Sequence, residues 1–327
     1  DIPAVKPGRT GIHVDGSGPA PPTNTVIRDC QIGATFGEGI LVESVDEPLL
    51  LDSNLLREDE TNEPVLPPNE GVNILLFGSF GAVLQSNLIS GGGDGVVLDG
   101  CQGIEFGGNS VDAPGGHGYR SFDSQALGFR DDVANGALLN GFFFDACANV
   151  SLESVSSANN ERNGIEIVRR LADAPGGYRL VGRRPPSSGS VVDTPREDRF
   201  DPLDFPDLEI VENGAAVIVT EYVLDGVLIH DGAPETVIEG AAVSFNGGDG
   251  IDVRSPFGDV LVLSSELRGN GVHGVNVAKL GSEPGGIPPI AGIGQARRGN
   301  AIRGNLGDGV RIVDSSFVFL GGNTIGD

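Results

Sequence analysis

The chain has 327 residues, with 52 glycines and 21 prolines but no tryptophan or methionine, a composition unlike that of an ordinary multidomain enzyme. Hydrophobic residues make up 39% and aromatic residues 6%, so a core must be built from Val, Ile and Leu, which favour strands. The net charge of −25 repels nucleic acid and anionic membranes, and no stretch approaches the roughly 18 consecutive apolar residues of a membrane span. We therefore expect no nucleic-acid partner and no membrane insertion.

The chain begins at Asp1 without a methionine or a signal-peptide pattern, which predicts a processed or excerpted chain. Its acidic surface is poor in lysine and favours an extracellular or cell-surface location. Three cysteines, with no CxxC pair among them, are too few for a disulfide scaffold and indicate no metal or redox site.

A four-residue pattern of glycine, apolar residue, variable residue and apolar residue recurs from end to end of the chain. It stands at 11–14, 39–42, 71–74, 95–98, 118–121, 141–144, 164–167, 226–229, 250–253, 274–277 and 309–312. The basic spacing is 23 residues, as from Gly95 to Gly118, or 24 residues, as from Gly250 to Gly274. A second apolar run follows in each repeat, for example at 259–262.

Short alternating segments of this kind predict strands. Ile165 and Ile167 lie on one face and Glu166 on the other. One repeat cannot bury its apolar face, but stacking the next copy about 4.8 Å away builds a continuous core. Asparagines recur after the second strand, where they tolerate turns and bond along a stack: Asn54, Asn87, Asn109 and Asn323. The pattern predicts an all-β parallel solenoid of about eleven turns, or rungs.

The segments 246–253 (NGGDGIDV) and 304–312 (GNLGDGVRI) resemble the right-handed parallel β-helix superfamily. That superfamily includes pectate-lyase-like enzymes, polygalacturonases, alginate epimerases, phage tailspikes and surface adhesins. The resemblance covers nearly the whole chain and implies one right-handed parallel β-helix domain over residues 1–327. It is specific for the fold and leaves the function open.

Extra residues must leave the stack where the spacing exceeds the period, at 15–24, 57–69, 169–208 and 281–298. The longest insertion, 169–208, begins with an arginine-rich stretch that contains Arg183 and Arg184. That stretch folds back on the acidic surface, clamps an anionic ligand or contacts another subunit. Arg183 and Arg184 are therefore candidate ligand-binding residues.

The outward positions of the first strand carry their densest group of ionisable residues at Glu166, His230, Asp252 and Arg254. We take these four as candidate ligand-binding residues. A ladder of solvated salt bridges would explain the same residues without a ligand.

Polar residues also stand immediately before the repeat glycines. Glu70, Asp94 and His117 precede three successive glycines and resemble the motifs of polygalacturonase-type hydrolases, in which two carboxylates act as acid and base. The resemblance implies catalytic roles for these three and for Arg120, which would hold a uronate. The same position holds Asp or His on later repeats too, so turn chemistry is the alternative.

Calcium is a second interpretation of acidic residues beside glycine, because Ca²⁺ takes hard oxygen ligands. Asp94, Asp249 and Asp308 are of this kind, but the nine-residue period of calcium rolls is absent. Four scattered histidines form no zinc motif. We expect no metal centre and no cofactor.

Two cysteines share one position of the repeat. Cys101 and Cys147 each follow their repeat glycine by six residues and stand two rungs apart, roughly 9.6 Å. A disulfide needs Cα atoms within about 7 Å, so free thiols are predicted.

Two classes of function fit the sequence. No polar cap is visible at either end, and open ends of a β-stack expose apolar rungs and unpaired backbone groups. We therefore expect a structural or surface protein that associates with other copies of itself through its terminal rungs into a filament. The alternative is a carbohydrate-active enzyme, a lyase, epimerase or hydrolase, acting on an acidic polysaccharide.

Overall fold

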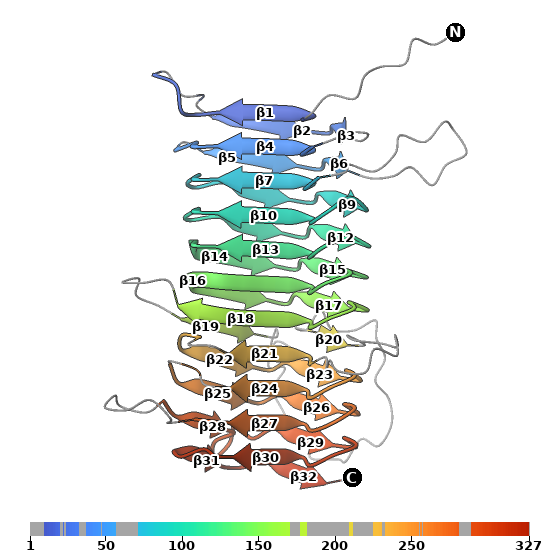
Figure 1. Cartoon of the computed structure of the whole chain (residues 1–327), viewed down its shortest axis with the longest axis vertical. Coiled ribbons are helices and arrows are strands. Elements are labelled where there is room, and N and C mark those ends of the chain that lie inside the picture. The colour runs from blue at the N-terminus through green and yellow to red at the C-terminus, as the bar shows by residue number, and fades with distance from the viewer. Residues whose placement is uncertain are drawn as a thin grey trace, which may run out of the picture.

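The computed structural model describes residues 10–19, 22, 24–32, 37–46, 48–56, 71–170, 177–181, 209–211, 225–230, 233–254, 256, 258–280 and 289–326. These residues form strands and turns, and among them is no helix with the length and apolarity that a membrane crossing requires. The strands stack in parallel from β1 to β32 along one axis (Figure 1). Each rung contributes one strand to each of three sheets, which we call A, B and C.

Sheet A contains β1 (Ile12–Asp15), β4 (Ile40–Glu43), β7 (Ile74–Phe77), β10 (Val96–Asp99), β13 (Tyr119–Phe122), the first half of β16 (Phe142–Glu153), β18 (Ile165–Arg170), β21 (Val227–His230), β24 (Ile251–Arg254), β27 (Val275–Ala278) and β30 (Val310–Val313). Sheet B contains β2 (Thr25–Arg28), β5 (Leu49–Asp52), β8 (Val83–Gln85), β11 (Glu105–Gly107), β14 (Gln125–Arg130), the second half of β16, β19 (Tyr178–Val181), β22 (Thr236–Glu239), β25 (Val260–Leu263), β28 (Ala291–Ile293) and β31 (Val318–Leu320). Sheet C contains β3 (Gln31–Ile32), β6 (Leu55–Leu56), β9 (Leu88–Ser90), β12 (Ser110–Asp112), β15 (Val133–Asn135), β17 (Ser156–Ala158), β20 (Glu209–Val211), β23 (Ala242–Ser244), β26 (Glu266–Arg268), β29 (Ala301–Arg303) and β32 (Thr324–Gly326). The predicted all-β parallel solenoid is confirmed.

Like residues stack on like residues in the core. Ile165 and Ile167 are fully buried, as their alternation with Glu166 predicts. The centre of the stack is aromatic: the rings of Phe106 and Phe129 are parallel with centroids 4.4 Å apart. The paired strands therefore place equivalent side chains in columns, one residue from each rung.

The repeat glycines are explained by a close approach between rungs. A Cβ on Gly118 would lie 2.6 Å from the carbonyl oxygen of Gly141 on the next rung. That distance is too short for any side chain, so the position requires glycine wherever the spacing is this tight.

One predicted register differs in the structure. Ile74 pairs with Ile40 on one side and Val96 on the other, so Asn73, and not Gly71, takes the place of the repeat glycine. The apparent motif at 71–74 is therefore shifted by two residues. Its outward residues are Leu75 and Phe77.

The predicted asparagine column is confirmed between sheets B and C. The Nδ2 atom of Asn54 donates to Oδ1 of Asn87 at 3.0 Å, and Asn87 donates to Asn109 at 2.9 Å. Asn109 donates in turn to Asp132 at 2.8 Å. Asn300 and Asn323 repeat the arrangement near the C-terminal end.

Asp132 ends this ladder for a chemical reason. The next residue in the column is Val155, which offers no side-chain acceptor, so an amide at position 132 would lack one of the two acceptors that Asn87 and Asn109 each have. A carboxylate instead accepts from Asn109 and from the backbone N–H of Arg130. Burial raises the pKa of Asp132 to about 7.

The cysteine prediction is confirmed. Cys101 and Cys147 share a column with Ser124 between them, and all three cysteines are free thiols. Burial raises the pKa of Cys147 to about 12, so this thiol is unreactive at neutral pH.

The segment predicted as one insertion over 169–208 is interrupted by a strand of the stack. Strand β19 lies within it, pairs with β16 and β22, and buries Tyr178 and Leu180 in the core. The alternation of Tyr178 and Leu180 with polar neighbours fits the core pattern, which explains the difference. Arg183 and Arg184 lie outside the described residues.

We expect Asn87→Ala to destabilise the fold strongly, because it leaves buried partners on two rungs unsatisfied. The expected loss is about 2–3 kcal/mol in urea unfolding at equilibrium. The control Asn135→Ala removes two exposed bonds, one donated to Asp112 and one accepted from Asn159, and should cost less than about 0.5 kcal/mol. Equal losses for the two variants would contradict a stabilising role for the buried ladder.

Candidate active site on the outer face of sheet A

The turn that leads into each sheet A strand is held by a column of side-chain acceptors. Each side chain accepts the backbone N–H of the equivalent residue on the next rung, at 2.7–3.3 Å. We call this the acceptor column; it consists of Asp94, His117, Asn140, Asn163, Asp225, Asp249 and His273, and ends at Asp308. Only residues with a short acceptor fit it, which explains its alternation among Asp, Asn and His.

The structure brings three of the four predicted catalytic residues together. Oδ1 of Asp94 accepts the backbone N–H of His117, and Oδ2 of Asp94 pairs with Arg120 at 3.1 Å. Burial lowers the pKa of His117 to about 4, and its Nδ1 atom accepts an N–H, so the ring is neutral with its proton on Nε2. The guanidinium of Arg120 lies 4.4 Å from the ring centre of Phe122, a cation–π contact.

The fourth residue, Glu70, lies outside the described residues. Val72 holds the position of the acceptor column one rung before Asp94, because the register is shifted there.

Glu166 is the centre of a polar cluster on β18. Its Oε1 atom lies 2.9 Å from Nε2 of His230, and its Oε2 atom accepts from Asn140 at 2.6 Å and from Asn163 at 3.2 Å. Burial opposes ionisation, but the hydrogen bonds from His230 and Asn140 outweigh it and lower the pKa of Glu166. Glu166 is therefore a carboxylate at neutral pH.

A second cluster lies on the following rungs. Carboxylate oxygens of Asp225, Asp249 and Asp252 lie within 4.8 Å of one another, and all three residues are buried. Arg254 forms an ion pair with Asp252 and is the cation of the cluster among the described residues. Burial, followed by the charge of Asp252, raises the pKa of Asp225 to about 8, and burial also raises the pKa of Asp249.

One asparagine connects the two clusters. Asn163 donates to Glu166 through Nδ2 and accepts the backbone N–H of Asp225 through Oδ1. The ionised Glu166 and the protonated Asp225 therefore stand on adjacent rungs. Leu228 separates Glu166 from Asp252 in the outward column.

The four residues predicted as a ligand-binding patch pair as Glu166 with His230 and Asp252 with Arg254. Sequence reasoning did not single out Asp225, Asn140 or Asn163 for this site. All three stand immediately before a repeat glycine, so their shared position was visible, but their convergence on the outward residues was not. Hydrogen bonds extend the second cluster through Asn276 to Arg311.

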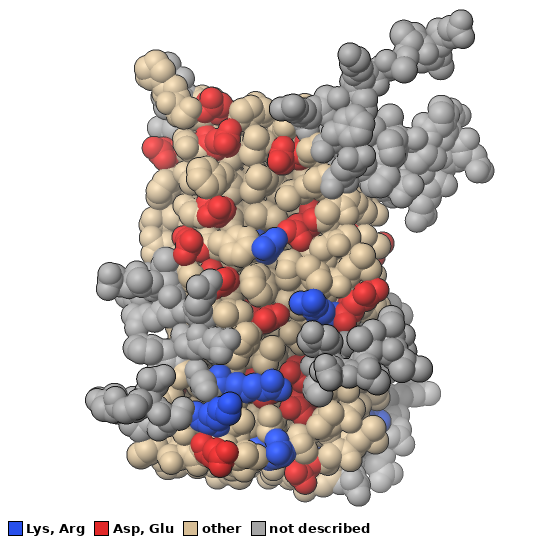
Figure 2. Space-filling view, viewed as in Figure 1, with Lys and Arg blue, Asp and Glu red and all other residues tan. Residues whose placement is uncertain are grey.

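The charge of this face is unevenly distributed. Figure 2 shows mainly Asp and Glu over its upper half, while most of the Lys and Arg lie lower, around β24 to β30, with further Asp and Glu beside them. Arg254 is about half exposed while its partner Asp252 is fully buried. The guanidinium is therefore the part of this ion pair that an anionic ligand can reach.

Two sets of acids bear on a metal site. Asp94, Asp249 and Asp308, the acids considered for Ca²⁺ from sequence, stand on different rungs and do not converge. Asp225, Asp249 and Asp252 are close enough to share an ion, and Arg254, which pairs with Asp252, competes with a cation for that carboxylate.

Three sheets in parallel register and an ionisable patch on one outer face define a parallel β-helix protein with a candidate active site. Residues 10–173 match the family described as "Right handed beta helix region", and the chain belongs to that family. No curated protein sequence matches it.

Solved structures with this fold include alginate-modifying enzymes. The chain is similar to the A-module of the mannuronan C-5 epimerase AlgE6 from Azotobacter vinelandii, with 15% identity, a TM-score of 0.54, and coverage of 88% of this chain and 69% of that one. It is also similar to the periplasmic alginate epimerase AlgG, with 13% identity, a TM-score of 0.56, and coverage of 91% and 76%. Likeness at these identities establishes the fold.

The raised pKa of Asp225 predicts an unusual dependence of stability on pH. Its pKa is about 8 in the folded chain and ordinarily 3.8, so folding takes up a proton between these values. The stability from Asp225 is complete below about pH 4 and is lost as the pH rises through about 8. We expect Asp225→Asn, which keeps the acceptor for Asp249, to flatten the urea-unfolding stability curve between pH 5 and pH 9.

Asp308→Asn is the control, because Asp308 is exposed at the end of the same column. Its stability curve should keep the shape of the wild-type curve. An Asp225→Asn curve with the same slope as the wild-type curve over this range would contradict a buried protonated acid.

Proposed function

We propose that the chain is a carbohydrate-active enzyme that acts on an acidic polysaccharide bound along the outer face of sheet A. One observation carries the proposal: Glu166 and Asp225 stand on adjacent rungs with pKa values shifted in opposite directions. A carboxylate and a protonated carboxylic acid at one site are the two partners of acid–base catalysis.

We assign to Arg254 the binding of the substrate carboxylate. A uronate residue carries a carboxylate, and a half-exposed guanidinium is the group that binds it in a forked geometry. Arg311 stands two rungs further on, where it contacts Asn276, and would meet a later residue of the same polysaccharide. Both arginines lie in the part of the face where positive charge gathers (Figure 2).

The chemistry that fits is proton abstraction next to the uronate carboxylate. The base, the Glu166–His230 pair, removes the proton on the carbon beside the carboxylate, and the electron pair moves into that group, where Arg254 stabilises the added charge. Asp225 then returns a proton. Delivery to the opposite face of the same carbon gives epimerisation, whereas delivery to the leaving glycosidic oxygen completes an elimination.

The structural comparisons support this substrate class. Two proteins with the same fold are named as a mannuronan epimerase and an alginate epimerase, and both names specify a polymer of uronates. We place the protein outside the cell or at its surface, where such polymers occur. The periplasmic location in the name of one of these proteins is consistent with that placement.

The test is activity on a panel of alginate, polymannuronate, polygalacturonate and glycosaminoglycans. Product analysis separates the reactions: unsaturated ends absorb near 230 nm after elimination, changed NMR signals report epimerisation, and new reducing ends alone report hydrolysis. We expect Glu166→Gln and Asp225→Asn each to lower kcat by about 10²-fold or more, the usual contribution of general acid–base catalysis.

The matched control is His13→Gln. Nε2 of His13 and Oε2 of Glu43 form an equivalent contact, 2.7 Å long, in the first strands of the same sheet. This variant should retain wild-type activity. Inactivity of the wild type on every acidic polymer, or equal losses in the three variants, would argue against the enzyme.

End-to-end assembly through the last described rung, formed by β31 and β32, is the other function that the sequence allows, and it stays a prediction. Contact between unlike ends is heterologous and builds filaments when it does not close.

Light scattering at low and high salt tests this candidate. The net charge of −25 opposes association, so screening should increase the mass of the particles. Phe319→Lys should keep the interior rungs folded and abolish the increase, because it places a charge on the terminal strand. Monodisperse wild-type monomer at both salt concentrations would exclude assembly through this rung.

A further inference from the structure

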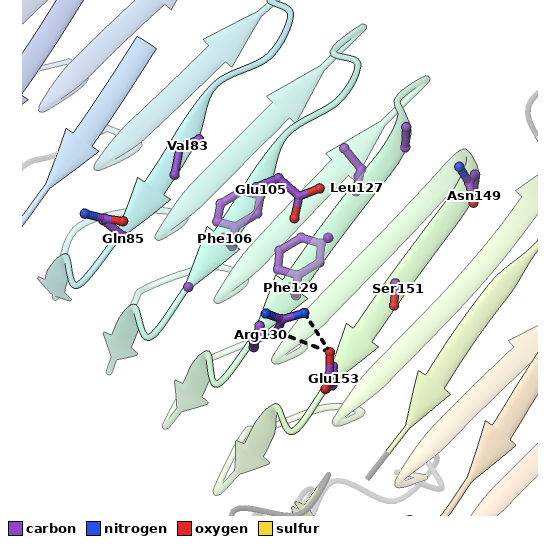
Figure 3. A pocket seen from close by; sticks show the side chains of 13 residues that line it. Val83, Gln85, Glu105, Phe106, Leu127, Phe129, Arg130, Asn149, Ser151 and Glu153 are labelled. Carbon is purple, nitrogen blue, oxygen red and sulfur yellow. Dashed lines mark hydrogen bonds and ion pairs between the residues drawn. The ribbon is translucent and has the colours of Figure 1, made fainter. Parts of the chain in front are cut away.

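A hollow of about 450 Å³ lies on the outer face of sheet B, away from the candidate active site. Figure 3 shows its walls on β8, β11, β14 and β16, and its volume is within the range of small-ligand sites. Glu105 stands on one side and the Arg130–Glu153 ion pair, 3.0 Å long, on the other. Its remaining polar side chains include Asn149 and Ser151.

Two glycines leave the space open, and the backbone does not require either of them. Gly107 and Gly128 occupy outward positions of β11 and β14, and neither has the left-handed conformation that favours glycine. A Cβ on Gly107 would meet nothing within 4 Å, whereas one on Gly128 would meet the carboxylate of Glu105. The column of Gly128 holds Val237 and Leu261 further along. Because neither glycine carries a side chain, backbone atoms form the floor of the hollow.

The polar groups around this floor have unused bonding capacity. Glu105, Asn149 and Ser151 are exposed, and none of these side chains has a hydrogen-bond or ion-pair partner in the described part of the chain. The carboxylate of Glu105 extends over Gly128 toward the middle of the hollow (Figure 3). A carboxylate, an amide and a hydroxyl together can accept and donate around the edge of a flat ring.

We propose that this hollow binds a neutral sugar residue of a glycan. A sugar ring can lie flat on the backbone floor, and adjacent hydroxyl groups can each donate to one oxygen of Glu105. Glu105 and Glu153 outweigh Arg130 by one negative charge, so a neutral sugar is favoured over a uronate in this hollow. This site does not depend on the enzymatic proposal.

The experiment measures binding of neutral oligosaccharides with gluco, manno, xylo and galacto configurations by calorimetry and saturation-transfer NMR. Oligomannuronate and oligogalacturonate are the acidic probes. Gly128→Val fills the floor with a residue that favours strands, and Glu105→Gln removes the charge. We expect at least one neutral probe to bind the wild type, and each variant to weaken it about tenfold or more, the effect of losing a charge-assisted hydrogen bond or the ring position.

Two controls locate the binding. Glu161→Gln removes an exposed carboxylate from a turn outside the hollow and should leave the affinity unchanged. Asp225→Asn should also leave it unchanged, which separates this site from the candidate active site. The proposal is overturned if no neutral probe binds, if Gly128→Val binds as the wild type does, or if an acidic probe competes for the hollow.

Discussion

The structure depends on one requirement at the turn into sheet A: from His117 to Asp308, the backbone N–H that stands before the strand must find a side-chain acceptor on the rung before it. The sheets satisfy their own N–H groups, but the turn does so through side chains, from Asp94 along to His273. The acceptor must be short and fixed, which limits the column to Asp, Asn and His. This constraint of folding places ionisable groups in a buried line beside the outer face of sheet A. The second carboxylate oxygen of each aspartate takes no part in this hydrogen bond and can bind another group. Oδ2 of Asp94, for example, pairs with Arg120.

Most of the fold could be predicted from the sequence because its period is expressed in every rung. The alternation of Ile165, Glu166 and Ile167 gives the strand faces, and the recurring asparagines give the turn between sheets B and C. The register at 71–74 could not be predicted by the same argument. A shift of two residues leaves every side chain on its original face, so Gly71 and Asn73 are equivalent in an alternating pattern. Only the pairing of Ile74 with Ile40 and Val96 distinguishes them.

The types of residue in the candidate site could be predicted from the sequence, but their contacts with one another could be predicted only in part. Glu166 and His230 are 64 residues apart, and their contact follows from the adjacency of β18 and β21, which extra residues conceal in the sequence. Asp225 is a turn acceptor like its neighbours in the column. What distinguishes it is burial beside Asp249 and Asp252, and burial sets its pKa. The properties that separate a catalytic acid from a structural one thus arise from packing between rungs, which no single repeat encodes.

The net charge of −25 repels a polyanion, so binding of an acidic polysaccharide by this chain requires an explanation. Long-range repulsion weakens at physiological ionic strength, where the Debye length is about 8 Å, so the charges within that distance of the ligand decide the outcome. On sheet A those nearby groups are the cations Arg254 and Arg311 and the acids Glu166, Asp249 and Asp252, and protonation of Asp225 removes one negative charge from the same cluster. For the proposed reaction, the protonated acid would therefore have an electrostatic consequence as well as a chemical one. It would lower the repulsion that a uronate meets at this cluster, and that advantage would disappear as the pH rises through the pKa of Asp225.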